Sequence, residues 1–112
     1  MALITSHTLN GTDGTHAGGI AVTLSRLGQV NEIIFETVMD ARGRLEQEIA
    51  PDQIDPGAIY ELVFETGTFW NDRHISCAIP QIALRFLMPN QTGKYHMPVI
   101  LNPHSYTVWS SS

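Results

Sequence analysis

Alternation of large apolar side chains with small or polar ones is the dominant pattern along this chain of 112 residues. Residues 20–24 alternate in this way, and residues 60–64 and 82–86 place large apolar side chains at every second position. Residues 31–39 add a run rich in isoleucine, phenylalanine and valine. A period of two residues is typical of half-buried strands, so the pattern predicts several short strands.

Turn signals separate these runs. Residues 66–74 lack alternation, and they predict one short helix. Many short strands joined by such turns predict an all-β sandwich or barrel. Neither an internal repeat nor a linker divides the chain, which predicts a single domain over residues 1–112. The turn signals are Asn10-Gly11, Asp13-Gly14, Gly18-Gly19, Arg42-Gly43, Pro56-Gly57 and residues 89–93.

Composition excludes several classes of protein. A hydrophobic content of 43% with only 15% charged residues fits an ordered domain whose surface includes subunit interfaces. A net charge of −5 with six Lys and Arg argues against nucleic-acid binding. The sequence predicts no membrane span. A single cysteine, Cys77, cannot form an intramolecular disulfide, and the start of the chain lacks a secretory pattern, so a cytoplasmic location is expected.

The candidate chemistry is limited to imidazoles, an arginine and hydroxyls. The five histidines lack the spacing of a zinc motif, and neither a nucleophile elbow nor a phosphate-binding glycine loop is present. We therefore expect no cofactor. A histidine can take a proton from water near neutral pH, and an arginine can hold a planar anionic substrate. These residue types suit hydrolysis of a small, electron-poor ring.

Three segments point to a known family. Residues 4–9 form a strand-like stretch with one histidine, residues 40–44 read Asp-x-x-Gly-Arg, and residues 95–103 begin Tyr-His-Met-Pro. In this order they resemble the transthyretin-like family, and within it the 5-hydroxyisourate hydrolases, which open one ring of a purine-degradation intermediate with water. The resemblance implies an all-β, transthyretin-like (prealbumin-like) two-sheet sandwich of about eight strands. It also implies one short helix between the fifth and sixth strands.

The resemblance implies a role for each matching residue. His7 and His96 would manage the proton and the water, Arg44 the polar edge of the substrate, and Ser112 the orientation of the reacting groups. It further implies a homotetramer, formed by sheet-edge pairing and then back-to-back packing of dimers. The sites would lie in a channel at the dimer–dimer interface and take a small heterocyclic substrate. Residues expected to contact this substrate are Tyr106, Trp109 and Ser110.

The end of the chain departs from the family pattern. The hydrolases end in Tyr-Arg-Gly-Ser, whereas this chain ends Trp109-Ser110-Ser111-Ser112 and so loses a phenol hydroxyl and a guanidinium. Two alternatives therefore stay open beside 5-hydroxyisourate hydrolysis. One is a diverged enzyme that opens or closes a different, less anionic ring in a biosynthetic pathway. The other is a non-catalytic binder of small molecules, as transthyretin is.

Each candidate also has a plainer interpretation. Without the resemblance, His7 would be a surface or interface histidine and His96 a core histidine bonded to backbone. An ionisable ring among Met, Pro, Val and Ile is costly, which favours a functional His96. Arg44 is expected at a buried edge, or else as a solvated turn residue like Arg42, and Trp109 could simply pack. No role is assigned to His16, His74, His104 or Trp70.

Overall fold

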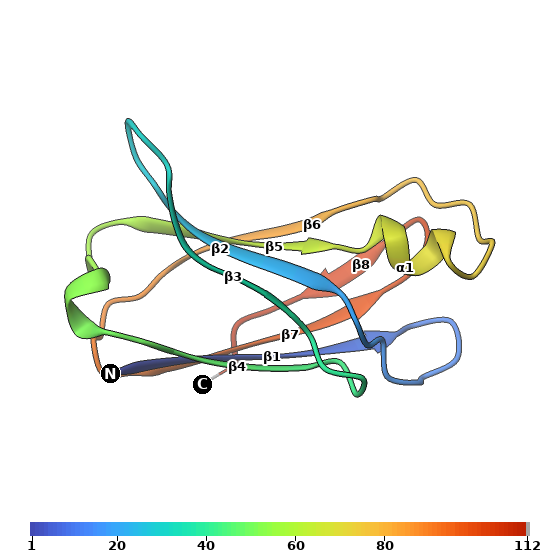
Figure 1. Cartoon of the computed structure of the whole chain (residues 1–112), viewed down its shortest axis with the longest axis horizontal. Coiled ribbons are helices and arrows are strands. Elements are labelled where there is room, and N and C mark those ends of the chain that lie inside the picture. The colour runs from blue at the N-terminus through green and yellow to red at the C-terminus, as the bar shows by residue number, and fades with distance from the viewer. Residues whose placement is uncertain (112) are drawn as a thin grey trace.

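The computed structural model describes residues 1–111, and in them eight strands form two four-stranded sheets that pack face to face (Figure 1). The first sheet has the order β4-β1-β7-β8: Arg44–Ile49, Ala2–Asn10, Lys94–Leu101 and Tyr106–Val108. The second has the order β3-β2-β5-β6: Glu32–Val38, Ala21–Leu27, Ile59–Glu65 and Ile82–Leu87. Two short helices lie outside the sheets: η1 (Pro51–Gln53) and α1 (Gly67–Asn71).

The predicted two-sheet β-sandwich with one short α-helix is confirmed. The alternating runs form β2, β5 and β6, the run in residues 31–39 forms β3, and α1 stands between β5 and β6. On β5 the side chains of Tyr60, Leu62 and Phe64 are fully buried, while their neighbours in the strand are partly exposed. Arg85 on β6 points away from the core and pairs with Glu61 of β5, at 2.9 Å.

The hydrophobic core fills the space between the sheets. Its centre consists of aliphatic and aromatic side chains from both sheets, and burial of such surface is the main force that holds the layers together. At one end of the sandwich α1 contributes Trp70, which is fully buried and meets Phe69 edge to face at 5.0 Å between ring centroids. Trp70 is therefore a core residue. The largest fully buried side chains also include Ile4, Ile20, Leu24, Ile49, Leu62, Ile82, Met88, Met97 and Leu101.

The strands nearest the two ends of the chain meet inside one sheet. β1 pairs with β7 in parallel, whereas the other strand pairs in residues 1–111 are antiparallel. The pair is pinned from the core side, where the buried hydroxyl of Ser6 donates to the Met97 carbonyl at 2.6 Å. Because β4 and β8 flank this pair, residues from four distant segments share one sheet face.

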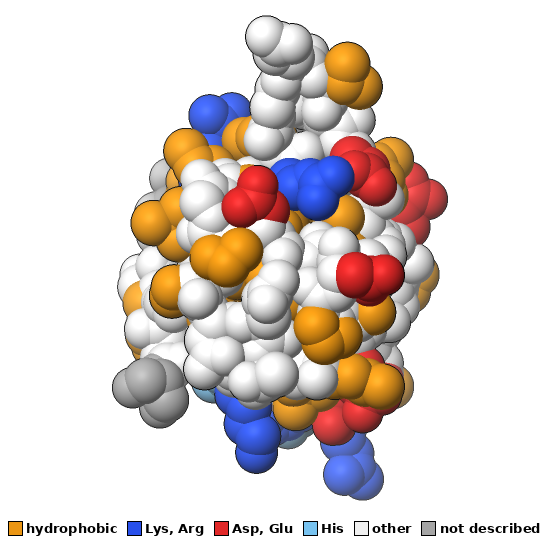
Figure 2. Space-filling view, turned by 90° about the vertical axis from the view of Figure 1, so that its left-hand side faces the viewer, with side chains coloured by type: hydrophobic (Ala, Val, Ile, Leu, Met, Phe, Trp, Pro, Cys, Tyr) orange, Lys and Arg blue, Asp and Glu red, His pale blue; other side chains and the backbone are white. Residues whose placement is uncertain are grey.

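The hairpin of β2 and β3 projects beyond the body of the sandwich, as Figures 1 and 2 show. Val30 at its tip is 85% exposed, and an ion pair between Arg26 and Glu32 joins the two strands near the tip. Within the described residues, no helix combines the length and apolar character needed to cross a bilayer.

Candidate active site

The outer face of the β4-β1-β7-β8 sheet carries most of the predicted site. Along β1 every second side chain is buried in the core, so His7 and Thr5 project from the opposite, outer face. β7 alternates in the same way and turns His96 outward, and Arg44 of β4 lies opposite His7. In Figure 2 basic side chains and a histidine lie along the lower edge, on the side of this sheet. Cross-strand pairing then arranges the outer face in rows.

The first row joins Glu46, Thr5, His96 and Ser111. Thr5 pairs with Glu46 on one side and with His96 on the other. Ser111 bridges to His96 from beyond β8, and its backbone N–H donates to the His96 carbonyl at 2.7 Å. The row therefore places a carboxylate, two hydroxyls and an imidazole in line across the sheet.

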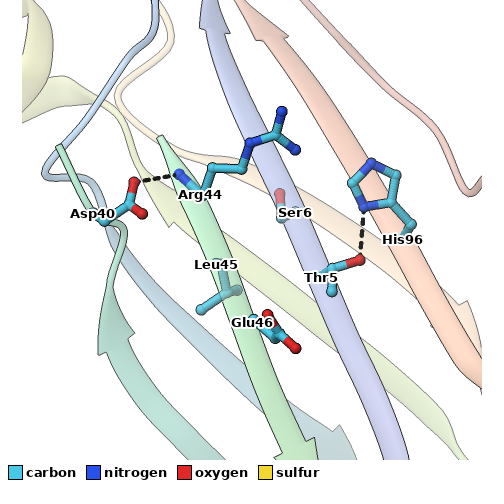
Figure 3. A pocket seen from close by; sticks show the side chains of 7 residues that line it. All are labelled: Thr5, Ser6, Asp40, Arg44, Leu45, Glu46 and His96. Carbon is cyan, nitrogen blue, oxygen red and sulfur yellow. Dashed lines mark hydrogen bonds between the residues drawn. The ribbon is translucent and has the colours of Figure 1, made fainter. Parts of the chain in front are cut away.

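A hydrogen bond of 2.7 Å joins Thr5 Oγ1 and His96 Nδ1 (Figure 3). His96 is half-buried on the outer face, so it is not a histidine sealed in the dry core. When His96 acts as a base at Nε2, its Nδ1 carries the proton and donates to Thr5. The threonine thus holds the ring in one orientation and leaves Nε2 for water or a substrate.

The second row joins Arg44, His7, Pro98 and Trp109. His7 pairs with Arg44 of β4 and with Pro98 of β7. The Trp109 backbone N–H donates to the Pro98 carbonyl at 3.4 Å, which continues the row onto the tail. An arginine and an imidazole on adjacent strands therefore lie one step along the sheet from His96.

A tight turn before β4 positions Arg44. One carboxylate oxygen of Asp40 accepts hydrogen bonds from the backbone N–H groups of Arg42 and Arg44, each at 2.9 Å. These bonds, that of Arg44 first, hold the pKa of Asp40 below its usual value. Gly43 supplies the positive φ of 71° that the turn requires, and its Cα approaches the backbone of Thr8 too closely for a side chain.

The expectation of a buried Arg44 is wrong, because its side chain is exposed. The reason is topological: β4 is an edge strand, and Arg44 lies on its outer, solvent-facing side. In Figure 3 the guanidinium extends over the sheet on the same side as the His96 ring. Within residues 1–111 Arg44 forms no ion pair, so its charge is available to a substrate.

A cavity of about 310 Å³ opens between these groups (Figure 3). It joins Arg44 and Asp40 on the β4 side to His96 on the β7 side, across Thr5 of β1. Its size suits a small heterocycle rather than a polymer. Its lining is Thr5, Ser6, Asp40, Arg44, Leu45, Glu46 and His96.

His7 lies beside this cavity and does not line it. Burial, the positive charge of Arg44 and the neighbouring His16 lower the pKa of His7 below its usual 6.5. A hydrogen bond of 2.9 Å joins His7 Nε2 to His16 Nδ1. At neutral pH His7 is therefore an uncharged imidazole, suited to accept a proton.

The predicted substrate contacts fall on different faces. Trp109 pairs with the row of His7 and is 41% exposed. Tyr106 pairs with Leu101, whose side chain is buried, so its register position belongs to the inner face. The same register sets Ser110 opposite buried Met97. Ser112 lies outside the described residues.

Sequence reasoning missed Thr5, Glu46, His16 and Ser111 as members of the site. Thr5 and Glu46 carry a signal in hindsight, since each lies two residues from a predicted catalytic residue on a strand of period two. The position of His16 depends on the turn that precedes it, and that of Ser111 on the pairing of the tail with β7, so neither residue carries a local signal. His74 and His104 are exposed outside both rows, and in the described part of the chain no three potential ligands cluster as a metal site.

The fold and this arrangement define a member of the HIUase/Transthyretin family, whose model matches residues 4–110, and the chain belongs to that family. It is 32% identical to 5-hydroxyisourate hydrolase of Mus musculus, over 97% of this chain and 94% of that protein. It is 30% identical to 5-hydroxyisourate hydrolase of Pseudomonas aeruginosa, over 100% and 93%.

Solved structures agree on the architecture. The structure of Klebsiella pneumoniae 5-hydroxyisourate hydrolase superposes with a TM-score of 0.83 at 26% identity, and each chain is covered completely. Sea bream transthyretin in complex with thyroxine superposes with a TM-score of 0.85 at 24% identity, over 96% of this chain and 93% of that one. At this identity, the similarity to sea bream transthyretin shows a shared fold and no more.

Proposed function

We propose that this protein is a cofactor-free hydrolase that opens the ring of 5-hydroxyisourate by cleaving a cyclic amide C–N bond. The observation that carries the proposal is the outer-face cluster of His7, His96 and Arg44 on three adjacent strands beside a cavity of about 310 Å³. Relatives that align over nearly the whole chain and are named 5-hydroxyisourate hydrolase support it.

In this reaction His96 acts as the general base. Its Nε2 takes a proton from water while Thr5 holds Nδ1, and the hydroxide adds to the ring carbonyl carbon. Arg44 stabilises the negative charge that develops on the carbonyl oxygen. Collapse of this intermediate breaks the C–N bond, and the ring nitrogen leaves with the proton that His96 returns. The uncharged His7 supports proton transfer beside Arg44.

Residues of β8 and the tail would complete the substrate site. Ser112 would orient the reacting groups from the tail, and Trp109 would provide an aromatic wall for the substrate. Ser110 on the tail and Tyr106 on β8 would contact the ring from the edge of the site, since their register positions face inward.

A homotetramer would complete the site. The outer face that carries both rows is open in a single chain, and catalysis of this kind gains from exclusion of bulk water. Packing of a second dimer on this face would cover its apolar members and form the channel, and sedimentation equilibrium would measure the mass. The apolar members of this face are Leu3, Leu9, Pro98, Ile100 and Trp109.

The free thiol of Cys77 supports a location in the reducing cytoplasm.

The direct test is the ultraviolet decay of freshly made 5-hydroxyisourate. Wild-type protein should accelerate it, and His96→Ala should lower the rate by about 10²-fold or more, as loss of a general base does. His104→Ala is the matched control, because His104 is exposed outside both rows. Decay at the uncatalysed rate with wild-type protein would refute the assignment.

Glu46 favours a second candidate. Its carboxylate lines the cavity in the row of His96, where it repels an anionic ring. The alternative enzyme acts on a less anionic ring. Glu46→Gln measures this repulsion, because it should lower KM for anionic 5-hydroxyisourate and leave KM for a neutral ring unchanged. A binding protein without activity would keep its ligand affinity, within a small factor, in His96→Ala.

A further inference from the structure

His7 is tied to a second imidazole that the mechanism above does not use. His7 Nε2 and His16 Nδ1 are 2.9 Å apart, and the two ring centroids are 5.1 Å apart with a tilt of 40°. Such a bond fixes both the rotation of a histidine ring and the nitrogen that carries its proton. The hydrogen bond with His16 therefore affects which nitrogen of His7 can accept a proton.

The backbone holds His16 in place independently of its side chain. Residues 15–17 return beside β1 after a turn: the Asn10 N–H donates to the Thr15 carbonyl at 2.8 Å, and the Ala17 N–H donates to the Thr8 carbonyl at 2.9 Å. His16 consequently bridges to Leu9, whose side chain is on the outer face. His16 thus lies on the same face as His7.

The segment continues the sheet where β4 begins. The Thr8 N–H donates to the Gly43 carbonyl at 2.8 Å, so β4 and residues 15–17 flank the same edge of β1. His7 is therefore enclosed on this edge by Arg44 on β4 and by His16 on the returning segment.

Charged or ionisable groups face His7 from the neighbouring elements. Arg44 approaches from β4, His16 from the returning segment and His96 from β7, and each lowers the pKa of His7 after the larger effect of burial. A hydrogen bond with the Arg42 backbone works in the opposite direction. β8 and the tail place Trp109, which does not titrate, in the same row. Of these groups His16 is the one in direct hydrogen-bond contact with the His7 ring nitrogen Nε2.

We propose that His16 is a positioning residue for His7: through the hydrogen bond of 2.9 Å it holds the ring in one orientation and one tautomer. The inference rests on the proposed function, since it assigns His7 a role in ring opening. His16 does not line the cavity, so it would act on the reaction only through His7.

Three variants test the role, with steady-state rates measured on 5-hydroxyisourate from pH 5 to 8. His16→Ala should lower kcat about threefold to tenfold, the effect of one lost hydrogen bond, while KM stays within about twofold. The acid limb of kcat/KM should move to higher pH. His16→Asn places an amide where Nδ1 was, so kcat should recover while the acid limb stays shifted. His104→Ala should match wild type throughout.

Histidine NMR titration gives a readout that does not need activity. The His7 ring should titrate at higher pH in His16→Ala than in wild type, with circular dichroism confirming the fold. An active wild type with His16→Ala indistinguishable from His104→Ala overturns the role of His16. An inactive wild type refutes the proposed function instead. In that case an unchanged His7 titration overturns the inference as well.

Discussion

Thr5→Val removes the hydroxyl that holds His96 and little else. Valine matches threonine in shape and suits a strand equally well. The bond it deletes joins Thr5 Oγ1 to His96 Nδ1 at 2.7 Å on a half-buried face, and within residues 1–111 no other hydrogen bond reaches that ring nitrogen. The substitution therefore isolates the orientation of His96 from its chemistry.

The size of the effect follows from the bond. A neutral side-chain hydrogen bond contributes about 0.5–1.5 kcal/mol, and each 1.4 kcal/mol is a factor of ten in rate. We expect kcat to fall about threefold to tenfold. KM should change less, because Thr5 does not carry charge for substrate binding. The free energy of unfolding should fall by no more than about 0.5–1.5 kcal/mol, the contribution of the same bond to the fold.

The assay is steady-state turnover of 5-hydroxyisourate together with thermal unfolding. Thr107→Val is the matched control: Thr107 is exposed on β8 opposite Ile100, which lies on the same outer face, and in the described chain its hydroxyl forms no hydrogen bond to protein. Equal kcat in the two valine variants, with both folded, would contradict the orienting role of Thr5.

Three further results follow from the site. Gly43→Ala should lower the free energy of unfolding in urea by about 1–3 kcal/mol, because a Cβ there would lie 2.5 Å from the Thr8 carbonyl oxygen. Gly14→Ala, at φ 76° with open space around it, should show the smaller loss from backbone strain alone. Because the pKa of His7 is lowered, kcat/KM should stay high somewhat below pH 6.5. The uncharged His7 ring should contribute to stability above pH 6.5, and this contribution should be lost as pH falls through the lowered pKa of His7. The lowered pKa of Asp40 should give a contribution that is present above pH 3.8 and lost as pH falls further, which a series of melting temperatures in His7→Gln and Asp40→Asn would resolve.

The fold could be predicted because its signal is local. Period-two alternation and glycine-containing turns mark most of the strands, and the non-alternating residues 66–74 contain α1. The outward direction of His7 and His96 also follows from alternation, since His7 lies between buried Ser6 and Thr8 and His96 precedes buried Met97. These features depend only on neighbours in the chain.

The parts that could not be predicted depend on which strand lies beside which. Alternation does not say that β4 is an edge strand, and so it could not tell an exposed Arg44 from a buried one. The contact of His16 with His7 requires the return of residues 15–17 along β1. The inner register of Tyr106 requires the pairing of β8 with Leu101 of β7. Sequence pattern carries none of this long-range information.

The parallel contact of β1 with β7 makes activity depend on the pairing of two segments far apart in the chain. The paired residues of β1 and β7 are separated by 91 positions in the chain. Until β7 has paired, His96 is absent from the site and one long edge of β1 has no partner strand. Contacts this distant in sequence form slowly. Turnover in a refolding experiment would consequently appear only after β1 and β7 have paired, which makes catalysis a reporter of this distant contact.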